Sequence, residues 1–296
     1  ISMIRSCMDV KLNVRPVFVQ FAHKYYYEGP CRMSGGETLE PGFDSIVNSA
    51  RMRETLEGIQ KVMPDCVNLM EPVSVEVTCD WDIKEEYFEE LLKDRDQVDV
   101  YLASNGFGAD AVFNEFCLRC KKPVCILPNI WNPAKSGMLF SMGVDAICEL
   151  DWEDTVKQLM VRHARKAISQ SNLLLVPRFN YDIPAAGATD SFVNLRAVTD
   201  LMGVRFRTVN IHEIMDQMHP LTEEGNYTTP GRVTPNITEE EIRELESVAD
   251  ELLSGAEEAE IEKDKLVKSL IAHRVIQKNM DLYDCSGVVI PCPDPC

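Results

Sequence analysis

The sequence has no apolar run of about 18 residues, the length that a membrane-spanning helix needs. Its opening residues, 1–6, are too few and too mixed for a secretory signal. Basic residues are also few, with 30 Lys and Arg against 48 Asp and Glu and a formal net charge of −18. Such a charge repels nucleic acids and anionic lipid surfaces. We therefore predict a protein that binds neither a nucleic acid nor a membrane.

Several catalytic and phosphate-binding signatures are missing too. No strand-like run leads into Gly-x-Gly-x-x-Gly or a Walker-type loop. The weaker pattern Ser-Asn-Gly-Phe-Gly at 104–108 favours a tight turn, although it would also place amides near an anion or hydroxyl groups. The five histidines are scattered and complete no Ser/His/Asp arrangement. The residues alone therefore identify no catalytic group.

The eleven cysteines do not form a disulfide framework, because their number is odd and their spacing is irregular. We expect free thiols and a cytoplasmic location. Cys117 and Cys120 form a Cys-x-x-Cys pair at a predicted helix C-terminus, whereas a reactive pair is expected at a helix N-terminus. We interpret both as core residues. A redox or metal module built on this pair, or on the terminal cysteines Cys285, Cys292 and Cys296, is the least favoured hypothesis.

Short apolar runs alternate with longer helical patterns in the first half of the chain. Strands are predicted over 12–19, 73–78, 98–103, 123–127 and 144–148, and helices over 43–62, 84–93, 109–120 and 134–142. This alternation is typical of a parallel sheet with helices on both faces. It predicts an α/β domain over residues 1–165.

The pattern restarts after a predicted helix at 152–169, for which Asp151 is the expected N-cap. A second α/β domain is predicted over 166–296. Its strands are expected at 172–177 and 204–210, and its helices at 191–202, 211–218 and 257–280, with an acidic helix before the last of these. In the helix at 191–202, an apolar stripe ending at Met202 is expected to be buried, and Gly203 to cap the C-terminus.

The chain closes on a predicted buried strand, 287–291, followed by a proline-rich turn that contains Asp294. In open α/β sheets, ligands bind outside the carboxyl ends of strands. Asp294 therefore suits contact with a ligand or metal, or the cap of a following helix. His23, near three tyrosines at 25–27 after the first strand, suits either sugar contacts or a subunit interface.

Several loose motifs follow in a characteristic order. The first strand contains Val14-Arg15-Pro16, residues 105–111 read Asn-Gly-Phe-Gly-Ala-Asp-Ala, and Lys-Pro-Val-Cys-Ile follows at 122–126. Residues 173–215 give a strand, a Gly-containing loop, a helix ending in Leu-Met-Gly-Val, and a strand entering Asn-Ile-His-Glu-Ile-Met. In this order and spacing, nearly the whole chain resembles the N-terminal and middle domains of the L-fucose isomerase and L-arabinose isomerase superfamily, in its fucose-isomerase-like branch.

The resemblance implies two consecutive Rossmann-like or flavodoxin-like α/β domains with mainly parallel sheets, without the family's C-terminal domain. It implies aldose–ketose isomerisation of a fucose- or arabinose-like sugar through a metal-assisted enediol, with Mn²⁺ or a similar divalent cation, in a homotrimer or homohexamer. Arg15, Asn105 and Asp294 are the implied substrate-binding residues. The family's metal ligands and proton shuttles correspond to sequence beyond Cys296, so no metal ligand is assigned to this chain, which is expected to be inactive alone.

The alternative is a non-catalytic carbohydrate-binding protein. Two α/β domains joined by a hinge can enclose a small sugar between them. Sugar binding without a metal would favour this second hypothesis.

Overall fold

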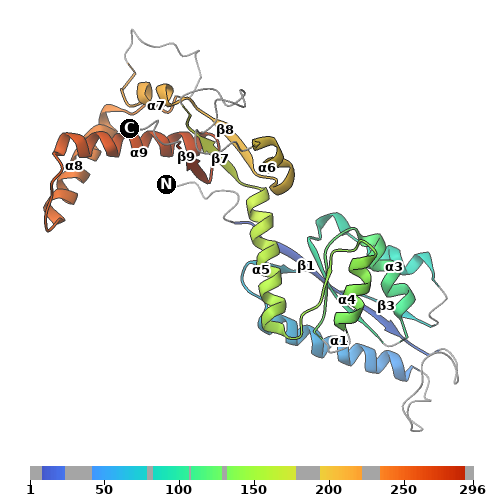
Figure 1. The fold of residues 1–296 in the computed structure, drawn as a ribbon. Coiled ribbons are helices and arrows are strands. Elements are labelled where there is room, and N and C mark those ends of the chain that lie inside the picture. Colours follow the sequence, from blue (N-terminus) through green and yellow to red (C-terminus); the bar gives the residue numbers. More distant parts are fainter. Residues whose placement is uncertain are drawn as a thin grey trace. The chain divides into compact units, whose positions relative to one another are not determined.

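A computed structural model describes residues 9–23, 42–78, 83–106, 108–128, 132–177, 194–221 and 234–290. The protein has an α/β fold in which all described strand pairs are parallel. The chain divides into two compact units between Ala164 and Arg165, within helix α5 (Trp152–Ser169). The predicted fold class, consecutive Rossmann-like or flavodoxin-like units with parallel sheets, is confirmed (Figure 1).

The first unit, Val10–Ala164, is built on one parallel sheet. Its strands are β1 (Leu12–Phe21), β2 (Val67–Leu69), β3 (Val73–Val77), β4 (Val100–Asn105), β5 (Val124–Ile126) and β6 (Ala146–Ile147). The order across the sheet is β2-β1-β4-β5-β6, and β3 also pairs with β1. Because β2 pairs with residues 12–14 and β3 with residues 17–21, the two short strands occupy successive stretches of one edge of β1.

Helices cover both faces of this sheet, as Figure 1 shows. They are α1 (Phe43–Val62), α2 (Glu85–Leu91), α3 (Asp110–Cys120), α4 (Asn132–Ser141) and the first part of α5, with a short 3₁₀ turn at Arg95–Gln97. Apolar residues of α2, α3 and α4 pack on one face, and those of α1 and α5 pack on the other. The apolar side chains of β1 and β4 are therefore buried on both faces, as parallel strands require.

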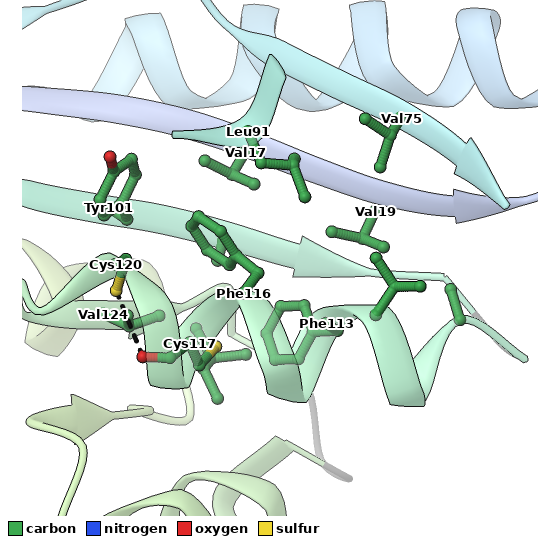
Figure 2. Close-up of a cluster of buried hydrophobic side chains, with 14 of the residues drawn as sticks. Val17, Val19, Val75, Leu91, Tyr101, Phe113, Phe116, Cys117, Cys120 and Val124 are labelled. Atoms are coloured by element: carbon green, nitrogen blue, oxygen red, sulfur yellow. Dashed lines mark hydrogen bonds between the residues drawn. The ribbon is translucent and has the colours of Figure 1, made fainter. Parts of the chain in front are cut away.

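The larger core cluster lies under α3. Figure 2 shows Phe113 and Phe116 packed against β1 and β4, and the Phe116 ring meets the Tyr101 ring edge to face, with centroids 5.1 Å apart. Cys117 and Cys120 lie in the same cluster and are buried, as predicted. Each fully buried large apolar side chain contributes about 1.5–3 kcal/mol to folding, so this cluster contributes much of the stability of the first unit.

The second unit includes Arg165–Cys296 and has a three-stranded parallel sheet. Its strands are β7 (Asn172–Leu175), β8 (Arg205–Thr208) and β9 (Gly287–Val289), in the order β8-β7-β9. Its helices are the second part of α5, α6 (Leu195–Met202), α7 (Ile211–Gln217), α8 (Glu239–Gly255) and α9 (Lys263–Leu282). Apolar residues of α7, α8 and α9 pack on Leu174 and Val176 to form the core.

Three predictions for the second unit were wrong. The last strand is not buried, because β9 pairs only with β7 among the described residues and leaves Val288 and Val289 38% and 46% exposed. The stripe of α6 is only half-buried, and Met202 is exposed. Helix α9 begins at Lys263 rather than at residue 257.

Gly203 is the predicted C-cap of α6, and the structure confirms it. Its φ is 79°, in the left-handed region, and its N–H donates to the Thr199 carbonyl at 2.8 Å. A Cβ at this position would lie 2.7 Å from Cβ of Ser169 at the end of α5. Glycine is therefore required here both by the backbone conformation and by the space.

We expect Gly203→Ala to lower the free energy of unfolding by about 1–3 kcal/mol, because it adds left-handed strain and a steric contact. Urea unfolding followed by circular dichroism measures the change. Gly137→Ala is the matched control, because Gly137 lies inside α4 and the methyl group of an alanine there would have no atom within 4 Å. The control is expected to be neutral or to stabilise the protein slightly, and equal effects of the two substitutions would contradict the assignment.

Helix α8 is held to α9 by a network around Glu241. Thr238 and Glu241 form a capping box, and Lys278 of α9 donates to Glu241 Oε2 at 2.9 Å and to the Asn236 carbonyl at 2.6 Å. Burial alone would raise the pKa of Glu241, but the hydrogen bonds from Lys278 and from the Thr238 amide outweigh it and lower that pKa. The ionised form of Glu241 is thus the one that stabilises the folded state.

Glu241→Gln is expected to lower the free energy of unfolding at pH 7 by about 1–2 kcal/mol, since it removes a charge-assisted hydrogen bond. A lowered pKa contributes stability above the ordinary value of 4.5, and this contribution is lost as pH falls through the folded-state pKa. The difference between variant and parent should therefore shrink below pH 4.5. Glu240→Gln, on the exposed face of the same turn, is the control, and a pH-independent difference would refute the prediction.

Candidate functional site

The sheet of the first unit has a topological switch point. From β1 the chain moves to β2 and β3 on one edge, then crosses to β4 on the other. Crossover connections diverge at such a point, and the crevice outside the carboxyl ends of the two strands is the usual ligand site of open α/β sheets. Here those ends are Phe21 of β1 and Asn105 of β4.

At the switch point, the backbone after β4 lies directly against the backbone of β1. Gly106, the residue after β4, donates its N–H to the Val19 carbonyl at 2.7 Å. A Cβ on Gly106 would lie 3.1 Å from the Gln20 Cα and 3.2 Å from the Val19 carbonyl oxygen. Glycine therefore allows the ends of β1 and β4 to come this close.

A group of polar side chains lies where β1 ends, on the side of α1 and β3. Asp44, in the first turn of α1, accepts hydrogen bonds at Oδ2 from the His23 backbone N–H (2.7 Å) and from His23 Nδ1 (2.8 Å). Asn48 donates to the Phe21 carbonyl and to Glu76 of β3. The carboxylate of Asp44 also complements the positive end of the helix dipole. These bonds fix the orientation of the His23 ring at the end of β1.

A second polar group lies on the side of α3 and α4. Asn105 donates from Nδ2 to Asp110 Oδ1 at 2.9 Å, and Lys135 of α4 donates to the same oxygen. Lys135 also lies over the Phe113 ring, 5.2 Å from its centroid. Asp110 is 49% exposed, whereas Lys135 is 19% exposed. The structure therefore places Asn105, one of the predicted substrate-binding residues, at the switch point beside a carboxylate and an ammonium group.

Arg15 lies away from this site. It is opposite Tyr101 in the β1–β4 register, whereas Val19 is opposite Asn105, so four residues or roughly 13 Å of strand separate the two positions. Arg15 is 5% exposed and donates to the Lys93 carbonyl at 3.0 Å, with Asp94 3.6 Å away. The structure does not bring Arg15 and Asn105 together.

The surroundings of Arg15 form a buried polar layer within the core. Tyr101 is fully buried, and burial raises the pKa of Tyr101 to about 12, although the nearby Arg15 charge partly opposes this. Tyr101 therefore stays neutral at physiological pH. These contacts tie β1 and the turn after α2 to one another, which is a structural role.

Asp294 lies outside the described residues. The strand before it, β9, ends at Val289 next to β7, whose other edge pairs with β8. The second sheet thus has a switch point of its own, between the carboxyl ends of β7 and β9. Cys292 and Cys296 also fall outside the described ranges.

The Cys117 and Cys120 thiols do not form a reactive pair. Burial raises the pKa of both thiols, and Cys120 donates weakly to the Cys117 carbonyl, as the dashed line in Figure 2 marks. Thiols held neutral in this way are poor nucleophiles. In the described part of the chain, no three His, Cys, Asp or Glu side chains converge on a point where a metal ion would bind.

A pocket of about 350 Å³ opens at the other end of the sheet, where β5 and β6 begin. Its walls include Cys117, Lys121, Lys122, Met142 and Asp145. Charges of both signs and a buried neutral thiol define no single ligand chemistry. We therefore place the candidate site at the switch point and not in this pocket.

Sequence reasoning found Asn105 but missed its partners. Asp110 and Lys135 lie 25 residues apart, and only the packing of α4 against α3 brings them together. The Asp44 partner of His23 was missed for the same reason. The one available signal was the Asn-Gly-x-Gly-x-Asp spacing, which places an acid in the first turn of the helix after the strand.

No protein-family model and no curated protein matches the chain. Among the helices that the structure describes, none has both the length and the apolar character needed to cross a membrane.

Arg15→Ala is expected to lower the free energy of unfolding by about 2–3 kcal/mol, because the buried stem leaves a cavity and the hydrogen bond to Lys93 is lost. Urea unfolding of the purified chain measures this change. Arg53→Ala, on the exposed face of α1, is the control and is expected to change stability by less than about 0.5 kcal/mol. A stability equal to that of the control would show that Arg15 has no structural role.

Proposed function

We propose that this chain is the two-domain, sugar-binding part of an aldose–ketose isomerase of the fucose-isomerase-like type, acting on a fucose- or arabinose-like sugar. The observation that supports it most is the polar switch point of the first unit, where Asn105 lies beside Asp110 and Lys135. Carboxylate, amide and ammonium groups at the carboxyl edge of a parallel sheet are suited to binding the hydroxyl groups of a small ligand.

The order of the elements supports the same proposal. Two flavodoxin-like units in succession, each with its own switch point, agree with the domain arrangement that the sequence resemblance implies. The pattern in the first unit, a strand that ends at Asn105 and is followed by Gly106 and then α3, is the structural context of the Asn-Gly-x-Gly segment on which that resemblance partly depends.

The role that we propose for this chain is binding and orientation of the sugar. In the resembling family, a divalent cation such as Mn²⁺ polarises the carbonyl and hydroxyl oxygens during isomerisation. The described residues do not fit such a cation, since no cluster of ligands converges among them, and in the proposal other polypeptide supplies its ligands. No proton-transfer residue is assigned to this chain.

The proposal extends to the oligomeric state, the cellular location and the partners of the protein. We expect a homo-oligomer, a trimer or hexamer, that works in the cytoplasm on a small sugar and without nucleic acid. The six described cysteines are all free, which suits a reducing compartment. The net charge of −18 disfavours polyanionic partners.

The test is titration of the 296-residue chain with L-fucose, L-arabinose and D-arabinose by calorimetry, together with a turnover assay in Mn²⁺. We expect binding on the order of 1 mM for at least one sugar and no isomerisation.

The outcomes separate the alternatives. Absence of binding by every aldose would overturn the proposal. Robust turnover by the chain alone would overturn the assignment of catalysis to other polypeptide. A longer chain that carries the downstream sequence is the third case. If it also binds sugar without turnover, a carbohydrate-binding protein is favoured instead.

A further inference from the structure

Among the described residues, both side chains that donate to Asp110 bond to the same carboxylate oxygen. Asn105 Nδ2 and Lys135 Nζ both donate to Oδ1. No hydrogen bond from a described residue reaches Oδ2, and the side chain is 49% exposed. One carboxylate oxygen is therefore fixed by two donors, while no described residue donates to the other.

The orientation of the Asn105 amide follows from this carboxylate. If the amide were turned over, its oxygen would face Asp110 Oδ1, and two acceptors would oppose each other. In the observed orientation, Asn105 Oδ1 is buried without a hydrogen-bond partner among the described residues. A buried unpaired acceptor is unfavourable, so the bond to Asp110 must outweigh that cost. The side-chain amide of Asn105 therefore serves to position Asp110.

From this geometry we propose that Asp110 is the group at the switch point that binds ligand hydroxyl groups, that Asn105 is a positioning residue that acts through it, and that Lys135 both positions Asp110 and donates to the ligand. The inference rests on the proposed function and changes the role of Asn105 in it. Oδ2 of Asp110 can accept hydrogen bonds from two adjacent hydroxyl groups, because a carboxylate oxygen has two lone pairs. Lys135 has further N–H groups with which to donate to a ligand oxygen.

The opposite charges of Asp110 and Lys135 determine which class of ligand can bind beside them. A phosphate at this position would meet the Asp110 carboxylate, and a metal ion would meet the Lys135 ammonium group. A neutral hydroxyl group can donate to one and accept from the other without either conflict. The pair of opposite charges, 19% and 49% exposed, therefore favours an uncharged polyol over either ion.

The experiment is nuclear magnetic resonance titration of the ¹³C-labelled chain with L-fucose, L-arabinose and D-arabinose. Sugar binding should shift the Asp110 carboxyl carbon signal, a change that a purely structural residue would not show. Asp110→Asn keeps the shape but removes the charge, and it should weaken binding about tenfold. Asn105→Ala and Lys135→Met should each weaken binding severalfold and broaden the Asp110 signal, while Lys135→Arg should restore it.

Lys122→Met is the matched control. It changes the net charge as Lys135→Met does but lies at the opposite end of the sheet, beside the start of β5. It should bind sugar as the parent does, and thermal unfolding of every variant checks that the fold is kept. The carboxyl shift in the unmodified chain keeps the test valid even where a variant unfolds.

Each remaining outcome is decisive. Equal sugar affinity of Asp110→Asn and the parent would overturn the inference and leave the proposed function standing. An unchanged Asp110 signal and affinity in Asn105→Ala would overturn the positioning role. No binding of any sugar by the parent chain would overturn both.

Discussion

Strand β1 pairs along both of its edges, and this double pairing organises the first unit. β2 and β3 share one edge, and β4 occupies the other over residues 14–19. Both faces of β1 are covered, so its ten residues are nearly all buried. Because β1 and β4 are neighbours in the sheet but not in the sequence, the helices that follow them lead to opposite sides. The crevice between their ends is a consequence of that order of strands.

Two polar groups lie near the ends of β1 and β4, each for its own reason. Asp44 and Asn48 belong to α1, which leaves the edge after β1, and they bind main-chain atoms at the end of β1. Asp110 and Lys135 belong to α3 and α4, which pack together on the other face. Each carboxylate lies in the first turn of its helix, where the helix dipole favours negative charge. The fold thus brings together side chains that are distant in the sequence.

Most of the fold could be predicted from the sequence, because the spacing of apolar residues indicates which side chains are buried. The helix at 43–62 and the helix at 152–169 were predicted with the observed bounds. β2 was missed because it is three residues long and only half-buried, which leaves little pattern to detect. The last strand was assigned to the interior from its apolar composition, but composition does not report whether a neighbouring strand or helix covers a residue.

The site was harder to predict than the fold. Asn105 could be singled out because it ends a strand beside a glycine. Lys135 could not, because its position in a helix of ordinary composition says nothing of the carboxylate it meets. For Arg15 the difficulty was different, because a motif drew attention to a residue that lies away from the site. Only the structure shows that its guanidinium group contacts Lys93 and Asp94.

Gly106 gives the crevice a base made of main-chain atoms, with Val19 and Gln20 within contact distance of it. Peptide atoms do not change when side chains mutate. Under the proposed function, variation in ligand preference would therefore arise from the walls, at α1 on one side and α3 and α4 on the other. Two sets of wall residues carried by separate helices could be exchanged independently, so one scaffold could adapt to differently substituted ligands without rebuilding the sheet beneath them.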